Sequence, residues 1–161
     1  MTVEELEEYG MERMEDDRVE RFLSSHSLGV LGLPTEDEPY LLPMSYGYDG
    51  GARLYFYFIV SDQSRKVKLL EQAETVSFLV YAAETMFNWQ SVGLTGTVQE
   101  LPDEKRAELT GDQEPRWRPE FFETASETER TRLYEFRIDD WAGIEHASLP
   151  PGFQQQAEKP D

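Results

Sequence analysis

The sequence predicts an α+β domain that is mainly β, in which about six antiparallel strands form a barrel-like sheet with two to four peripheral helices. The first observation is a series of short apolar runs separated by Gly, Pro and Asp residues. The second is Asp49-Gly50-Gly51, a hairpin turn signal between two of these runs. The third is residues 88–101, where apolar and polar positions alternate as in one long strand.

Helical spacing dominates the N-terminal region. A short helix is expected in the acidic stretch before residue 15, and a second helix is predicted over 17–25. We expect Gly29 to end this helical region. The inner face of the second helix carries Val19, Phe22 and Leu23, at i, i+3 and i+4.

Three strands are predicted next. Residues 30–33 form a short apolar run that stops at Pro34. Residues 40–48 form the second run, and Pro43 within it indicates an edge strand or a bulge, because proline has no N–H for the ladder. Residues 53–60 are apolar at successive positions, as expected for a strand that is buried on both faces.

Helices and strands alternate in the second half of the chain. One helix is predicted over 65–73, and an acidic helix over about 103–109. Gly93 and Gly96 permit a strong bend or a close approach of another group in the strand that carries them. The remaining strands are predicted at 75–81, 88–101 and 132–141.

The composition excludes several classes of function. The 161 residues include 33 acidic and 15 basic side chains, a net charge of −18. This charge excludes duplex nucleic-acid binding by phosphate neutralisation and argues against docking on an anionic membrane. The absence of cysteine excludes thiolate catalysis, Cys-ligated zinc, iron–sulfur clusters and disulfides. An acidic N-terminus and the lack of a long apolar run favour a cytoplasmic protein.

The basic residues are 11 arginines and only four lysines. Few lysines and many carboxylates are typical of halophilic cytoplasmic proteins, whose surface charges stay hydrated and mutually screened in molar salt. The alternative is an ordinary acidic protein from a mesophile.

Conventional catalytic signatures are missing. The two histidines, His26 and His146, lie far apart in the sequence without metal-ligand spacing, so no metal site is predicted. Phosphate-binding and nucleophile motifs of the glycine-rich types are absent as well. No catalytic side chain can be assigned, and a cofactor would have to bring any redox chemistry.

One basic cluster stands out against the acidic background. Arg65, Lys66 and Lys68 fall in the first turns of a predicted helix, where cations oppose the helix dipole. A bound phosphate would resolve this conflict, and the hydroxyls of Ser61 and Ser64 would add donors. The alternative is a solvated face that is paired with surrounding acids.

The strand at 40–48 is the second candidate feature. Its flat and soft side chains, with free backbone groups near the proline, suit a planar heteroaromatic ring. The alternative is an ordinary hairpin core. The residues concerned are Pro43, Met44, Ser45, Tyr46 and Tyr48.

These features, in this order, resemble the pyridoxamine 5′-phosphate oxidase-like family of FMN-binding split β-barrels. The resemblance extends over about residues 16–141 and is strongest to small members of the nitroimidazole-resistance-like or general flavin-binding type. The matching runs are PYLLPMSYGYDGGARLYF at 39–56, SRKVKLL at 64–70, VSFLVY at 76–81 and NWQSVGLTGTV at 88–98.

The resemblance implies a six-stranded antiparallel split β-barrel with peripheral helices. Residues 1–149 would form a single FMN-binding domain, and 150–161 a polar, loosely ordered tail. The family arrangement implies a homodimer with FMN at the interface. The implied isoalloxazine contacts are Pro43, Met44, Ser45 and Tyr46; the implied phosphate contacts are Ser64, Arg65 and Lys66, with help from Gln90 and Ser91.

Two departures from the family pattern limit the implied chemistry. The strand before the phosphate loop has Tyr57 or Phe58 where many nitroimidazole-type relatives have histidine. The stretch 141–152 lacks the substrate arginine of true pyridoxamine-phosphate oxidases. We therefore expect an FMN-binding oxidoreductase or flavin reductase that acts on an unidentified small-molecule substrate or electron donor. The alternatives are a flavin store without turnover, a split barrel that uses deazaflavin or heme, and a structural dimer whose basic cluster is solvated.

Overall fold

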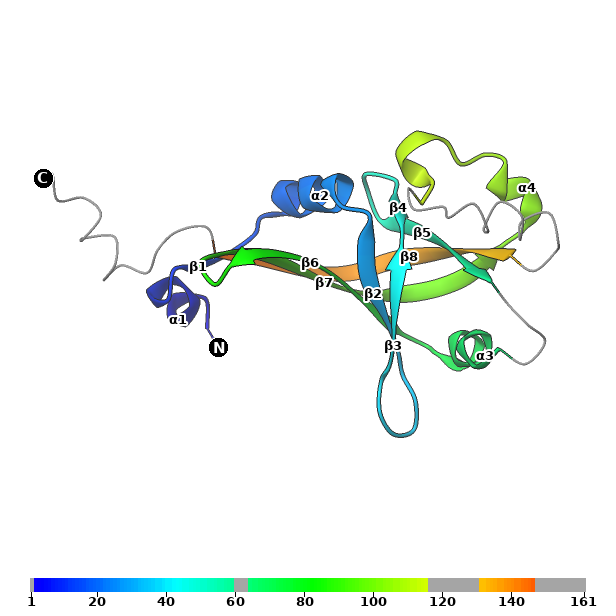
Figure 1. Cartoon of the computed structure of the whole chain (residues 1–161), viewed down its shortest axis with the longest axis horizontal. Helices are drawn as coiled ribbons and strands as arrows, with labels where there is room; N and C mark the ends of the chain where they lie inside the picture. Colours follow the sequence, from blue (N-terminus) through cyan, green and yellow to red (C-terminus); the bar gives the residue numbers. More distant parts are fainter. Residues whose placement is uncertain (1, 60–63, 116–130, 147–161) are drawn as a thin grey trace, which may run out of the picture.

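A computed structural model describes residues 2–59, 64–115 and 131–146 of the chain. Figure 1 shows one long, curved antiparallel sheet with short helices around it. The helices are α1 (Val3–Glu8), α2 (Asp16–Ser25), α3 (Arg65–Gln72), α4 (Asp103–Arg106) and the 3₁₀ turn η1 (Gly111–Gln113). The strands are β1 (Met11–Arg13), β2 (Leu28–Leu33), β3 (Tyr40–Ser45), β4 (Gly47–Tyr48), β5 (Arg53–Ile59), β6 (Val76–Thr85), β7 (Asn88–Leu101) and β8 (Thr131–His146).

The connectivity forces the sheet to curl. The strand order is β3-β2-β6-β7-β8-β5-β4, with β1 paired to β8. The two outermost strands, β3 and β4, follow one another in the chain with only Tyr46 between them. A flat sheet would hold its edges far apart, so this short connection requires a barrel that is split between β3 and β4. The predicted split β-barrel, mainly β with peripheral helices, is confirmed.

The strand count differs from the predicted six, because the described residues contain eight strands. Residues 40–48 break into β3 and β4 at Tyr46, whose backbone N–H donates to the Ser27 carbonyl at 2.9 Å. The second additional strand is β1, which has only three residues and was not recognisable from its pattern.

Buried aromatic rings fill the inside of the curl. Phe56 stacks on Phe78 with ring centroids 6.3 Å apart, and the Tyr46 ring meets Phe78 edge-on at 5.6 Å. The helix α2 closes one end of this core with its predicted residues Val19, Phe22 and Leu23, and α3 adds its buried side chains Val67 and Leu70. These inner faces have the helical spacing that the sequence predicts.

Two strand predictions are confirmed in detail. Pro43 lies on β3, an edge strand of the sheet. In the hairpin turn between β4 and β5, Gly50 has a φ of 83°. The Asp49 carboxylate accepts hydrogen bonds from the backbone N–H groups of Gly51 and Arg53 at 2.8 and 3.1 Å.

Several predicted boundaries were wrong. The strand predicted at 75–81 continues to Thr85 as β6, and the strand predicted at 30–33 begins at Leu28 as β2. Gly29 does not end the helical region, because α2 stops at Ser25 and Gly29 lies inside β2, against the Phe78 ring. The acidic helix α4 ends at Arg106 rather than near 109. The last strand continues to His146 because β1 and β7 both pair with its final residues. Ser61 and the tail at 150–161 lie outside the described residues.

Within the described ranges, we find no helix with the length and apolar character that crossing a membrane requires.

Candidate functional site

The basic cluster lies at the start of α3. Ser64 is the N-cap residue, and its hydroxyl makes no capping hydrogen bond to the helix. Arg65 and Lys66 occupy the first turn, which contains no acidic residue. The first backbone N–H groups of a helix have no partner within the helix, so this end offers donors and positive charge together.

Aromatic rings hold the two cations in different directions. The Arg65 guanidinium lies 4.9 Å from the centroid of the Tyr40 ring at the start of β3. The Lys66 ammonium lies 5.2 Å from the centroid of Phe58 near the end of β5. Each contact is a cation–π interaction, which fixes the head group without neutralising its charge. No ion pair joins either cation to a carboxylate of the described residues, although the chain is strongly acidic.

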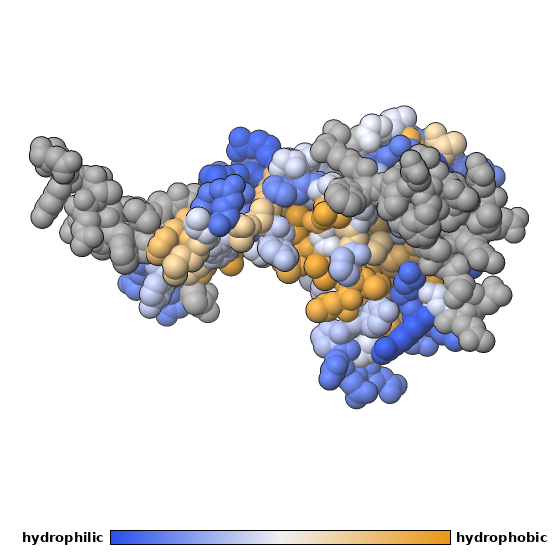
Figure 2. Space-filling view, viewed as in Figure 1, coloured by the Kyte–Doolittle hydropathy of each residue, from blue (hydrophilic) through white to orange (hydrophobic). Residues whose placement is uncertain are grey.

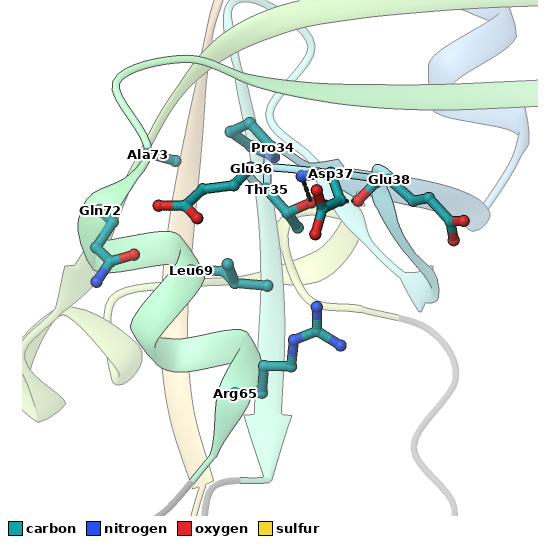
Figure 3. A pocket seen from close by; sticks show the side chains of 9 residues that line it. All are labelled: Pro34, Thr35, Glu36, Asp37, Glu38, Arg65, Leu69, Gln72 and Ala73. Atoms are coloured by element: carbon teal, nitrogen blue, oxygen red, sulfur yellow. Dashed lines mark hydrogen bonds between the residues drawn. The ribbon is translucent and has the colours of Figure 1, made fainter.

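Beside Arg65 lies an open cavity of about 900 Å³, shown in Figure 3. The β2–β3 loop, residues 34–38, forms one wall. One face of α3 forms the other wall, with the side chains of Arg65, Leu69, Gln72 and Ala73. The size falls within the range of small-molecule sites in proteins.

The loop on the far side of this cavity is internally braced. The Thr35 hydroxyl accepts a hydrogen bond from the Asp37 backbone N–H at 3.1 Å and donates one to the Glu38 carbonyl. This bracing presents three exposed carboxylates at the rim, from Glu36, Asp37 and Glu38. Sequence reasoning missed this wall, because three acids are not conspicuous among 33.

The outer face of the sheet forms a second candidate surface. Figure 2 shows hydrophobic residues gathered over β2 and β3 in the middle of this view. Pairing places Leu28 beside Ser45, Val30 beside Pro43, and Val30 also beside Leu79. The exposed large apolar side chains of β2, β3 and β6 are Leu28, Leu41, Leu79 and Tyr81. Large exposed apolar patches mark interaction sites in many proteins.

The four predicted ring contacts and the two predicted phosphate contacts Gln90 and Ser91 divide between the two faces of the sheet. By their positions in the ladders, Pro43, Ser45 and Ser91 belong to the outer face. Ser45 and Ser91 lie on β3 and β7, three strand spacings apart, which is roughly 14 Å.

The other three of these six residues are Met44, Tyr46 and Gln90, and they lie on the core face. Met44 packs against the core, and Tyr46 is buried, with its hydroxyl donating to the Leu23 carbonyl at 2.8 Å. The Gln90 amide lies 3.4 Å from the Glu145 carboxylate, which also pairs with Arg18 at 2.7 Å. The structure therefore does not bring the Gln90 and Ser91 side chains to one face.

Both histidines contact backbone carbonyl oxygens. The two ring nitrogens of His146 lie 3.1 and 2.9 Å from the carbonyl oxygens of Phe87 and Tyr9. The Nδ1 atom of His26 lies 2.8 Å from the Phe22 carbonyl oxygen in α2. Among the described residues, no group of three or more His, Asp or Glu side chains is arranged to hold a metal ion.

The curled sheet with its peripheral helices is a split β-barrel domain. The start of α3 is its cationic site. A sequence model of the pyridoxamine 5′-phosphate oxidase family matches residues 15–145. The chain belongs to this family, as its resemblance over residues 16–141 predicted.

Solved structures show the same fold at low sequence identity. A FAD-binding protein of Mesorhizobium loti superposes with a TM-score of 0.65 at 19% identity, covering 84% of this chain and 97% of that one. A proposed 5-nitroimidazole resistance protein of Bacteroides thetaiotaomicron superposes with 0.65 at 18% identity, covering 84% and 89%. A FAD and heme binding protein of Mycobacterium smegmatis superposes with 0.61 at 18% identity, covering 93% and 80%.

A curated relative gives a partial match. An uncharacterized protein of Rhizobium meliloti is 28% identical over 89 residues, which are 55% of this chain and 56% of the relative. The chain thus matches about half of that relative's length.

Proposed function

We propose that this protein binds FMN and acts as an FMN-dependent oxidoreductase or flavin reductase. The observation that carries the proposal is the pair Arg65 and Lys66, two cations at a helix start that lack ion pairs with the described residues. The family match and the FAD-binding proteins among its structural neighbours support a flavin as the ligand.

The donor set at the start of α3 fits a phosphate. Arg65 would offer the in-plane N–H groups of its guanidinium, and Lys66 a compact charge from the other side of the helix start. Ser64 would add a hydroxyl that the helix itself does not use. FMN, when bound, would supply hydride and electron transfer, and the chain would position it and exclude water.

The outer face of β3, β2, β6 and β7 would carry the ring. Leu28, Leu79 and Tyr81 present an apolar surface on which a planar ring loses water favourably. Pro43 adds a flat side chain on the edge strand beside this surface. These contacts would hold and orient a planar ring on the outer face of the sheet.

We also propose that a second copy of the chain covers this outer face. A symmetric dimer would bury the exposed apolar residues of both copies, and the flavin ring would lie between them. Two observations support this arrangement: the face is exposed, and β3 has no strand on its outer side among the described residues.

The decisive experiment compares flavin retention in the wild-type protein and the double variant Arg65→Glu/Lys66→Glu. Each charge-assisted hydrogen bond contributes roughly 1.5–3 kcal/mol, or about one to two decades of affinity, and the reversed charges add repulsion. We expect the double variant to lose FMN while its circular dichroism stays unchanged, because acids at a helix start are favourable. Absorption spectra and mass spectrometry of the released ligand identify flavin, deazaflavin or heme.

Lys68→Glu is the matched control, since Lys68 is an exposed cation two residues further along α3. Riboflavin, which lacks the phosphate, should bind the wild type weakly and the double variant equally weakly. FMN binding that is as tight in the double variant as in the parent would refute the phosphate site. Reduction of the bound flavin by a nicotinamide donor separates an enzyme from a store.

A further inference from the structure

We propose that Arg106 and Thr131 bind a small inorganic anion, of the size of chloride, between α4 and the start of β8. The inference does not rest on the proposed function, because the site is separate from the start of α3. It assigns a ligand to two buried polar atoms, the Nε atom of Arg106 and the Oγ1 atom of Thr131.

The first argument is the position of these two residues. Arg106 is the last residue of α4, and Thr131 is the first residue of β8. One Nη atom of Arg106 donates to the Thr131 backbone carbonyl at 2.7 Å, and the guanidinium lies 5.3 Å from the centroid of the Tyr57 ring. A hydrogen bond therefore already joins the two residues, which brings their remaining polar atoms within reach of one small ligand.

The second argument is that both atoms are buried without a hydrogen bond. Each has less than 1 Å² of accessible surface, and neither has a partner within the described part of the chain. Thr131 as a whole is only 8% exposed. Buried polar atoms nearly always have a partner, because an unpaired one has lost its hydrogen bonds to water. The Nε–H group can only donate, and a threonine hydroxyl can also donate, so the ligand must be an acceptor.

The third argument is charge. Neighbouring cations have carboxylate partners: Lys105 pairs with Glu108 at 3.4 Å, and Arg132 pairs with Glu100 at 3.6 Å. For Arg106, residues 2–59, 64–115 and 131–146 supply no ion pair. An anion satisfies both donors and also balances the partly buried guanidinium, which a water molecule does not. Because the two atoms are so little accessible, a monatomic halide fits better than a sulfate or a nucleotide phosphate.

This site lies on the opposite side of the sheet from the proposed phosphate contacts. Tyr57 and Phe58 are consecutive in β5, so their side chains point to opposite faces. Arg106 lies over Tyr57, whereas Lys66 lies over Phe58 in the main core. An anion at Arg106 is therefore distinct from a flavin phosphate at the start of α3.

The test is thermal unfolding of the full-length protein at fixed ionic strength, with sodium chloride replacing sodium gluconate, whose anion is too large for the site. Fixed ionic strength holds charge screening constant. Thr131→Val keeps the shape of the side chain and removes Oγ1. As chloride rises from about 20 mM to about 2 M, we expect the melting temperature of the wild type to rise by at least about 4 °C more than that of Thr131→Val. Thr131→Ser retains the hydroxyl and should respond like the wild type.

Arg106→Gln and Lys105→Gln form a matched pair, since each removes one positive charge from α4. Only Arg106→Gln should lose the response to chloride, because Lys105 is exposed and already paired with Glu108. Chlorine-35 NMR gives a second readout that does not depend on stability. The wild type should broaden the chloride line, bromide should reverse the broadening, and Arg106→Gln and Thr131→Val should abolish it.

Equal chloride responses of the wild type and Thr131→Val would overturn the inference. A response that Lys105→Gln removes as fully as Arg106→Gln would overturn it as well, because general charge would then explain the effect. Competition by sulfate as strong as that by bromide would overturn the assignment of a monatomic anion. None of these outcomes bears on flavin binding at α3.

Discussion

Tyr48 is buried at the end of the hairpin that closes the barrel, and its hydroxyl donates to the Gly51 carbonyl at 2.7 Å. Burial raises the pKa of this phenol well above its ordinary value of about 10, and the nearby Glu20 and Asp49 carboxylates raise it further. Burial also raises the pKa values of Tyr55 and Tyr134. The folded state therefore keeps these phenols protonated at a pH where the unfolded chain loses the protons.

This difference predicts a loss of stability in alkali. Below about pH 10 the phenols are protonated in both states, and the free energy of unfolding does not depend on them. Above that pH, each buried phenol should lower the free energy of unfolding by up to about 1.4 kcal/mol per pH unit. Urea denaturation between pH 8 and about 11 measures this slope.

The variant Tyr48→Phe should lose less unfolding free energy per pH unit in alkali than the wild type does. It also removes one hydrogen bond, so the free energy of unfolding at neutral pH should fall by about 1 kcal/mol. An unchanged alkaline slope in this variant would show that Tyr48 does not titrate on unfolding.

Residue roles were predictable only where the sequence context was unusual. Three cations in four positions of an acidic chain, Arg65, Lys66 and Lys68, identified the start of α3. Tyr46 was predicted among the ring contacts, yet its side chain is packed in the core, because the Leu23 carbonyl offers a partner there. Next to a break in a strand, the sheet face that a side chain occupies depends on where the hydrogen-bond ladder stops. The pattern of residues 40–48 does not reveal that position.

The long strand β7 shows how a single backbone position controls an element. Its register with β8 shifts between Thr95 and Gly96. A Cβ at Gly96 would lie 1.9 Å from the Arg137 carbonyl oxygen, whereas a Cβ at Gly93 would meet nothing within 4 Å. The bulge therefore depends on glycine at position 96 and not at position 93.

We expect Gly96→Ala to lower the free energy of unfolding by about 2–3 kcal/mol, because the backbone of β8 must shift to admit the methyl group. Gly93→Ala is the matched control in the same strand. It should be neutral or stabilise by up to about 1 kcal/mol through the lower entropy of the unfolded chain. Equal effects of both variants in thermal unfolding would contradict the assigned bulge.

Helices and strands whose apolar residues recur with a regular period were predicted well. Element boundaries that depend on pairing with another strand were not. The inner faces of α2 and α3 and the alternation of β7 were confirmed, because burial imposes a helical or a twofold period on the residues themselves. The full length of β8 escaped prediction, since its last residues are in a strand only because β1 and β7 pair with them. Long-range pairing of this kind leaves no local signal.

At the level of the whole molecule, an apolar face and a large negative charge act against each other. The outer face exposes Leu28, Leu41 and Tyr81, which favours association of two copies. Each chain carries a net charge of −18, which opposes association at low salt. In molar salt the screening length falls to about 3 Å, so the repulsion is removed while the apolar contact remains.

We predict that the fraction of dimer rises with salt and approaches completion in molar salt. Sedimentation velocity over a series of sodium chloride concentrations measures this fraction directly. The variant Leu41→Glu/Tyr81→Glu should remain monomeric throughout, because it places charge in the apolar face. A wild-type protein that sediments as a monomer in molar salt would refute the dimer.

The proline of β3 limits how copies of this chain can aggregate. Pro43 stands exposed on an edge strand, and it lacks the N–H that an added strand would need. The opposite edge is β4, which has only two residues. A continuous ladder from one molecule to the next is therefore interrupted at β3, and β4 is too short to template one, so fibril growth by addition to these two strands is disfavoured. At high protein concentration the broad apolar face therefore stays available to recognise a partner.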